Sequence, residues 1–305
     1  MPRIVIGSRG SNLALTQSKA VGELLRNAAP GLEVEIKIIH TKGDKILDTP
    51  LSQIGGKGLF TRELEVALLE KRIDLAVHSL KDLPTELPEG LALGCVPERE
   101  DPHDVFVSAE YDTLDALPVG ASVGTSSLRR RAQLLAYRPD LNVVDFRGNV
   151  DTRLRKVAEK QFDGAILARA GIVRIGRADA IRCSIPEEVM IPATAQGALG
   201  IEIREGDRRV EEIVLRIHDA RAFVEVTAER ACLAALEGGC QVPIGALARM
   251  NGASLTLVAC VCSLDGKDVL RFNAEGPIED AAALGLSVAE SLRAMGAADL
   301  IAAIR

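Results

Sequence analysis

The sequence predicts an α/β fold: two hinged α/β domains followed by a small α+β domain. Short apolar runs alternate with amphipathic stretches through the first two thirds of the chain, which is typical of strand–helix units with a mainly parallel sheet. Two proline-containing segments, 97–102 and 191–197, would carry the chain into the second unit and back. From about Ala220 the pattern changes to a helix, three strands and a final helix.

The first domain is predicted to comprise residues 1–98 plus 197–217. Ser11 is a residue type that caps helix N-termini, and it precedes an amphipathic stretch. Helical spacing of Leu64, Ala67 and Leu68 turns these side chains toward the core. The expected elements, in order, are a strand at 3–7, a helix at 11–29, a strand at 33–39, a helix at 59–71, and strands at 74–78 and 199–204.

The second domain is predicted at 103–192 and the third at 220–305. In the second, the expected elements are strands at 122–123, 142–146 and 164–168, with helices beginning at Ser126 and Asn149. In the third, they are a helix from about 220, three strands within 242–275 and a helix at 279–296.

Composition narrows the class of protein. The 305 residues are 47% hydrophobic and 26% charged, which is ordinary for a globular chain. A net charge of −6, 3% aromatic residues and no tryptophan argue against a nucleic-acid partner. Six cysteines without a paired framework, no signal peptide pattern and no membrane-length apolar run predict a soluble cytoplasmic protein without a membrane partner.

Arginine is concentrated where strands are expected to meet helices. The chain has 27 arginines and 10 lysines, and the segment 124–131 carries three of the arginines in a row. Similar turns occur at 7–11 and 147–153. Free N–H groups at a helix start, together with guanidiniums, make receptors for carboxylates or phosphates. A solvated basic helix face is the alternative; of the three adjacent arginines we expect one or two to enter a cleft.

Two further residues suggest chemistry. Asp82 follows a buried strand, beside Lys81 and in a turn fixed by Pro84, so it could stabilise a positive intermediate or move a proton. A turn-forming aspartate is the alternative. Cys240 lies on a glycine-flanked loop that would present a reactive thiol, although most lone cysteines are core residues.

Metal chemistry is not predicted. His40, His78, His103 and His218 have no metal-ligand spacing. The Cys260 and Cys262 thiols would share one face of a strand, without a second pair to complete a zinc site. The loop at 55–58 is interpreted as a flexible lid rather than a phosphate cradle.

Taken together, the chain resembles the porphobilinogen deaminase family, also called hydroxymethylbilane synthase, over essentially its whole length. The resemblance rests on six segments in the family's order: 6–11 (IGSRGS), 55–60 (GGKGLF), 78–84 (HSLKDLP), 124–130 (GTSSLRR), 147–154 (RGNVDTRL) and 237–240 (EGGC). It implies two hinged domains like those of solute-binding proteins and a third domain that carries the cysteine.

The resemblance also implies an activity. Such an enzyme is a transferase of porphyrin and heme biosynthesis, cytoplasmic and monomeric. Four porphobilinogen molecules are joined head to tail, each with loss of ammonia, onto a dipyrromethane cofactor held by a thioether bond to Cys240. Hydrolysis then releases the linear tetrapyrrole.

Matched positions imply the site residues. Asp82 is the implied catalytic residue. The implied cofactor-binding residues are Cys240 (covalent), Asp82, Lys81, Thr125, Ser127, Arg129, Arg130, Arg147 and Gly148. The implied substrate-binding residues are Arg9, Ser11, Gln17, Arg147, Arg153 and Gln196.

Two departures and two alternatives accompany this interpretation. Ala195 stands where the family more often has glycine, and Asp151 adds negative charge near Arg153. One alternative is a non-enzymatic two-lobe protein that binds a small anion. The other is a thiol-dependent transferase that turns over at Cys240.

Overall fold

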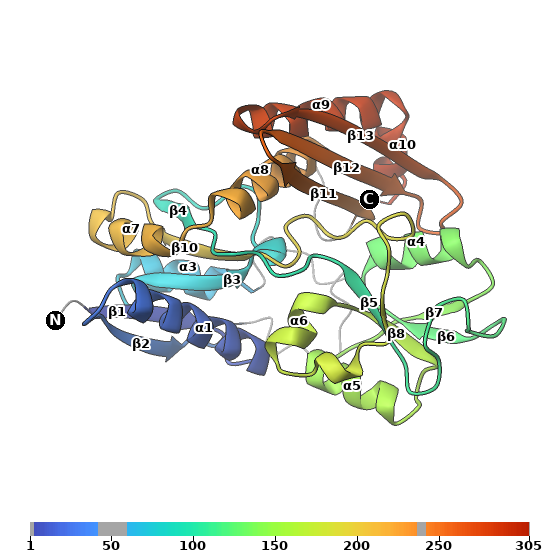
Figure 1. The fold of residues 1–305 in the computed structure, drawn as a ribbon, viewed down its shortest axis with the longest axis horizontal. Coiled ribbons are helices and arrows are strands. Elements are labelled where there is room, and N and C mark those ends of the chain that lie inside the picture. Colours follow the sequence, from blue (N-terminus) through green and yellow to red (C-terminus); the bar gives the residue numbers. More distant parts are fainter. Residues whose placement is uncertain (1–2, 42–59, 237–241, 305) are drawn as a thin grey trace. The chain divides into compact units, whose positions relative to one another are not determined.

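The structure, a computed structural model, describes residues 3–41, 60–236 and 242–304. The chain divides into two compact units, which are Met1–Glu100 with Ala198–Phe223, and Asp101–Gly197 with Val224–Arg305. Figure 1 shows the order of the elements along the chain. Within the described ranges, no helix is both long and apolar enough to span a membrane.

The first unit contains a five-stranded sheet of order β2-β1-β3-β10-β4. Helices α1 and α7 pack on one face and α3 packs on the other. The strands are β1 (Arg3–Ser8), β2 (Glu33–Ile38), β3 (Leu75–Ser79), β4 (Leu91–Cys95) and β10 (Leu199–Arg204). The helices are α1 (Asn12–Ala28), α3 (Arg62–Leu69) and α7 (Arg208–Val214), with 3-10 turns η1 (Leu80–Asp82) and η3 (Leu215–Ile217).

The second unit contains a five-stranded sheet of order β7-β6-β8-β5-β9. Helix α4 packs on one face, while α5 and α6 pack on the other. The strands are β5 (Asp104–Val107), β6 (Ser122–Gly124), β7 (Asn142–Val144), β8 (Gly164–Ala168) and β9 (Cys183–Ser184). The helices are α4 (Leu128–Tyr137), α5 (Val150–Ala158) and α6 (Arg169–Arg174), with the 3-10 turn η2 (Ala178–Ala180).

Each sheet has four strands that run in one direction and one strand that runs against them, so the prediction of mainly parallel sheets is confirmed. In the first, β1 is parallel to β2 and β3, whereas β10 is antiparallel to β3 and β4. The second repeats this pattern with β6 as the parallel centre and β5 as the antiparallel strand. In each sheet the antiparallel strand is the one that follows a crossing segment, 97–102 before β5 and 191–197 before β10.

The C-terminal segment forms the predicted α+β arrangement with its own core. Its three strands form an antiparallel sheet of order β11-β12-β13. The elements are α8 (Ala220–Ala235), β11 (Ile244–Asn251), β12 (Ser254–Cys262), β13 (Val269–Pro277), η4 (Ile278–Asp280), α9 (Ala281–Ala294) and α10 (Ala297–Ala302).

Local signals in the sequence were accurate at several helix starts. Ser11 caps α1, because its Oγ accepts a hydrogen bond from the Ala14 N–H at 3.3 Å. The helix expected from Ser126 begins instead at Leu128, with Ser127 as the cap. Ser126 and Ser127 are both serines and equally suited to cap a helix, so the sequence could not show which of them is the cap.

Candidate functional site

Asp82 lies at the end of η1, directly after β3. The turn is fixed by Leu80 and Leu83, which are buried, while Asp82 itself is exposed. The Leu80 N–H donates to the Ala198 carbonyl at 3.0 Å. Gln17 Nε2 donates to the hydroxyl of the preceding Ser79 at 2.9 Å. An anchored backbone therefore presents a solvent-facing carboxylate, with the half-buried Lys81 beside it.

Gly200 on β10 makes room for this turn. A Cβ at this position would lie 2.7 Å from Leu80 Cδ1 and 3.1 Å from Leu93 Cδ1. Only a glycine lets β10 approach the Leu80 side chain so closely. The position of the Asp82 turn thus depends on Gly200, a residue far away in the sequence.

Arg9 and Ser11 follow β1, the parallel neighbour of β3. Because adjacent parallel strands end at the same sheet edge, the Arg9 turn and the Asp82 turn emerge at one edge of the first unit. The Arg9 guanidinium lies 4.1 Å from the centroid of the Phe60 ring. Such cation–π contact restricts the arginine without removing its charge.

Asp104, at the start of β5, is the centre of a buried polar cluster in the second unit. Its Oδ2 accepts from Arg129 Nη1 at 2.7 Å. Its Oδ1 accepts from Arg130 Nε at 2.9 Å and Nη2 at 2.8 Å, and from Gln196 Nε2 at 2.9 Å. Burial alone would raise the pKa of Asp104, but the charges of Arg129 and Arg130 outweigh it and hold that pKa well below its usual value.

The first turn of α4 lies against this cluster. Thr125 is buried, and its hydroxyl accepts from the Ser127 N–H at 3.2 Å. Arg129 and Arg130 are also buried, whereas Arg131 is half-buried and donates to the Val143 carbonyl at 3.0 Å. The three adjacent arginines therefore separate into a buried pair and an outer third member.

Arg147, Gly148 and Arg153 lie around the start of α5. Gly148 has a φ of +117°, and a Cβ there would lie 2.7 Å from Thr152 Cγ2, so glycine is required. Arg153 lies over the Phe146 ring at 5.7 Å, and its buried Nε has no hydrogen-bond partner within the described ranges. Burial, with the nearby charges of Arg130 and Arg147, lowers the pKa of Arg153 to about 10. This position is strongly cationic, which favours binding of an anion.

The predicted residues fall into two sets. The first unit holds Arg9, Ser11, Gln17, Lys81 and Asp82. The second unit holds Thr125, Ser127, Arg129, Arg130, Arg147, Gly148, Arg153 and Gln196. Cys240 and the loop at 55–58 lie outside the described residues.

Sequence reasoning did not find Asp104. Its one signal in the sequence is its position. Asp104 is an acidic residue at the start of the apolar strand Asp104–Val107, where a buried carboxylate needs cationic partners such as arginine. The described part of the chain contains no cluster of three or more histidine, cysteine or acidic side chains that could hold a metal.

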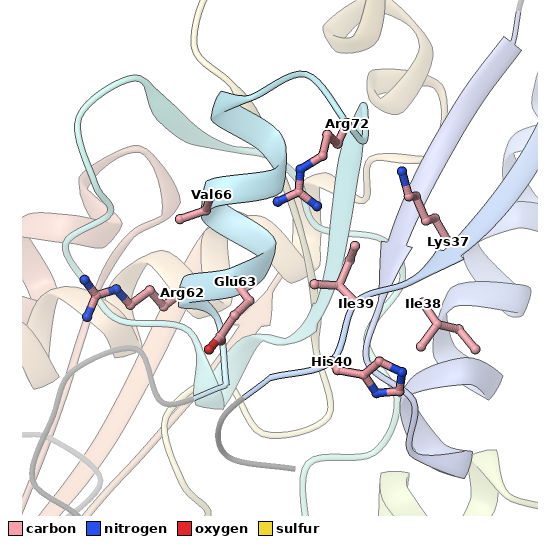
Figure 2. A pocket seen from close by; sticks show the side chains of 8 residues that line it. All are labelled: Lys37, Ile38, Ile39, His40, Arg62, Glu63, Val66 and Arg72. Carbon is pink, nitrogen blue, oxygen red and sulfur yellow. The ribbon is translucent and has the colours of Figure 1, made fainter. Parts of the chain in front are cut away.

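An open pocket of about 570 Å³ lies elsewhere in the first unit (Figure 2). It is formed between the end of β2 and α3, and it contains none of the predicted site residues. Its lining residues are Lys37, Ile38, Ile39, His40, Arg62, Glu63, Val66 and Arg72.

Comparisons with known proteins cover both units. Residues 4–212 match the family described as porphobilinogen deaminase, dipyromethane cofactor binding domain, and residues 223–294 match the C-terminal domain of that family. A porphobilinogen deaminase of Pelotomaculum thermopropionicum is 51% identical over 298 residues, 98% of this chain and 96% of the relative. That of Moorella thermoacetica is 51% identical over 305 residues, 100% of this chain and 97% of the relative.

Among solved structures, the methionine binding protein MetQ is similar at a TM-score of 0.45 and 14% identity, over 72% of this chain and 92% of that one. The whole-length relatives are named as enzymes, so the alternative of a non-enzymatic anion-binding protein is not supported.

Proposed function

The chain belongs to the porphobilinogen deaminase family, and we propose that its Asp82 turn and its arginine cluster carry the family's reaction. That reaction joins four porphobilinogen molecules head to tail on a dipyrromethane primer. Ammonia leaves at each addition, and hydrolysis releases the linear tetrapyrrole. The proposal concerns which residues of this chain perform each part.

The strongly cationic position at Arg153 is the observation that carries the proposal. Each porphobilinogen brings an acetate and a propionate, so every addition increases the negative charge to be bound. The lowered pKa of Arg153 reflects its burial and the repulsion from Arg130 and Arg147, a cost that a carboxylate would relieve. Each charge-assisted hydrogen bond to a carboxylate contributes about 1.5–3 kcal/mol.

The residues present fit an anionic dipyrromethane. The Nε atoms of Arg129 and Arg153 are buried and have no hydrogen-bond partner in the part of the chain that is described, so both are available as donors. When bound, the dipyrromethane supplies the pyrrole carbon at which the chain grows. Cys240 would anchor it covalently; the residues that would hold it are Lys81, Asp82, Thr125, Ser127, Arg129, Arg130, Arg147 and Gly148.

Asp82 is the proposed catalytic residue. Positive charge develops on the substrate as ammonia leaves, and a proton must leave after each carbon–carbon bond forms. An exposed carboxylate on a fixed turn can stabilise the positive charge and accept the proton. The residues proposed to bind substrate are Arg9, Ser11, Gln17, Arg147, Arg153 and Gln196.

We also propose that the protein is a cytoplasmic monomer. The five cysteines that the structure describes are free thiols, which suits a reducing compartment. Gel filtration with light scattering would test the monomer, because a mass near twice 32.5 kDa would contradict it.

Asp82→Asn tests the catalytic role. The amide keeps the size of the side chain but can neither accept a proton nor stabilise a cation, so we expect kcat to fall at least ~100-fold. Intact-protein mass spectrometry should still find two linked pyrrole units, and Cys240→Ser should lose them. Glu89→Gln, an exposed neutralisation in the same unit, is the control and should retain activity. Near-normal turnover by Asp82→Asn would remove Asp82 from its role.

A further inference from the structure

We propose that Asp104 is a positioning residue that holds the guanidiniums of Arg129 and Arg130 in the orientation needed to bind substrate and primer carboxylates. The inference rests on the proposed role of these two arginines in holding the dipyrromethane, and it extends that role to the carboxylates of the incoming porphobilinogen. Asp104 itself is fully buried and is placed in no contact with substrate.

The argument begins with helix geometry. Arg129 and Arg130 are successive residues of α4, and successive side chains on an α-helix point about 100° apart. Left alone they would diverge. Asp104 binds both, with one carboxylate oxygen assigned to each arginine at 2.7–2.9 Å. A single carboxylate therefore brings two diverging cations to one place.

Surrounding groups fix each guanidinium plane further. Arg129 Nη1 also donates to the Ile191 carbonyl at 2.7 Å. Arg130 Nη1 donates to the Ile166 carbonyl at 3.1 Å. Because each guanidinium is held by Asp104 and by one backbone carbonyl, its rotation would break two contacts for Arg129 and three for Arg130. Preorganisation of this kind is how rigid donors gain affinity for a ligand.

Gln196 fixes Asp104 in turn. Its Nε2 donates to Asp104 Oδ1 at 2.9 Å and to the Pro102 carbonyl at 2.7 Å. Its Oε1 lies 3.5 Å from Arg130 Nη2. The carboxylate of Asp104 thus has a defined position as well as a charge, and these two properties can be separated by experiment.

The test compares Asp104→Asn with Asp163→Asn in the purified holoenzyme. Asp163 is an aspartate of the same unit whose carboxylate accepts from the backbone and hydroxyl of Ser122, away from the arginines. We expect Asp104→Asn to raise the KM for porphobilinogen at least ~10-fold with a smaller change in kcat, because binding geometry is lost. Asp163→Asn should leave the KM unchanged.

An exchange variant separates position from charge. Asp104→Asn with Gln196→Glu returns one carboxylate to the cluster, within reach of Arg130 Nη2 but carried by residue 196 instead of residue 104. We expect this variant to recover the thermal stability of the wild type but not its KM, with Gln196→Glu alone as the reference. If Asp104→Asn alone does not fold, the KM of this double variant is used for the test instead.

Two results would overturn the inference. A KM for Asp104→Asn equal to that of Asp163→Asn would do so, and so would full recovery of the KM in the exchange variant, since charge alone would then suffice. Arg129→Gln and Arg130→Gln are measured alongside. If the two arginine variants leave the KM unchanged, the proposed binding role of Arg129 and Arg130 is wrong. If the arginine variants raise the KM but Asp104→Asn does not, only the positioning role of Asp104 is wrong.

Discussion

Ala195 adopts a backbone conformation that alanine rarely takes. Its φ is +57°, in the left-handed region, at the position where glycine was expected from the family resemblance. Glu229 compensates, because its Oε2 accepts from the Ala195 N–H at 2.6 Å and its Oε1 accepts from the Ala248 N–H at 2.9 Å. A left-handed alanine costs about 1–2 kcal/mol, so this single residue stores strain in the return segment.

Ala195→Gly should therefore stabilise the protein. Glycine adopts a positive φ without the Cβ clash, and we expect the free energy of unfolding to rise by about 1 kcal/mol. Urea unfolding followed by circular dichroism measures it. Ala193→Gly, two residues earlier and at negative φ, is the control and should destabilise. A loss of stability in Ala195→Gly would show that the strain is absent.

Single residues also mark the limit of sequence reasoning about the site. Asp82 was predicted from its place after a strand and before Pro84, which are local features. Asp104 was not predicted, because its role depends on Arg129, Arg130 and Gln196 meeting it in space. A carboxylate at the head of an apolar strand gives no local sign of its partners.

At the scale of elements, the strands and helices with clear periodicity were predicted closely. The strand at Leu199–Arg204 has the expected bounds, and Leu64, Ala67 and Leu68 of α3 are buried as expected. Strands β4, β5 and β9 were missed, because a short run such as Asp104–Val107 has too few residues to show alternation. The mainly parallel direction was predicted correctly, but not which strand is reversed, since that depends on pairing across distant segments.

The contact of β10 with the Asp82 turn can be tested by Gly200→Ala. The added methyl group would displace Leu80, and with it the backbone that carries Asp82. Small displacements at a catalytic group are costly, so we expect kcat to fall about 10–100-fold. Steady-state kinetics measure this, with thermal unfolding recorded in parallel.

Gly94→Ala is a matched control in the same sheet. Its added methyl group would lie 2.7 Å from Ile203 Cδ1, as close as the one at Gly200 lies to Leu80, but on β4 and away from the turn. We expect a similar loss of stability with kcat nearly unchanged. Equal losses of kcat in both variants would mean that the sheet, and not the turn, is being disturbed.

At the scale of the whole molecule, overall charge and site charge are opposite in sign. The chain carries a net charge of −6, yet its proposed ligands are polyanions. The proposed binding therefore depends on the local field of Arg130, Arg147 and Arg153; burial and the charges of Arg130 and Arg147 together lower the pKa of Arg153. Local fields of this kind are screened by salt when they are partly exposed.

The KM for porphobilinogen should accordingly rise with salt. Between about 0.05 M and about 0.5 M KCl we expect an increase of roughly threefold to tenfold, because the Debye length shortens from about 14 Å to about 4 Å. Arg153→Gln should raise the KM at low salt and flatten this dependence. Initial-rate measurements at several salt concentrations give both quantities.

Arg155→Gln provides the comparison at equal net charge. Arg155 lies two residues further along α5, is exposed, and is 3.9 Å from Glu159. If the local cluster binds the ligand, this variant should keep the wild-type KM and its salt dependence. Identical behaviour of the two variants would mean that only the overall charge matters.

The insertion of β10 between β3 and β4 also decides the order in which the protein can be completed. β10 pairs Leu199 with Ser79, so the first sheet lacks its fourth strand until the whole second α/β domain has been synthesised. The second sheet can form without a later domain being synthesised first, because its antiparallel strand β5 pairs with β8 within the same stretch of chain. Until then β3 has one unpaired edge and β4 is unpaired on both sides, so both are open to wrong partners. The sheet that begins to leave the ribosome first is therefore completed after the second sheet, whose last strand ends at Ser184.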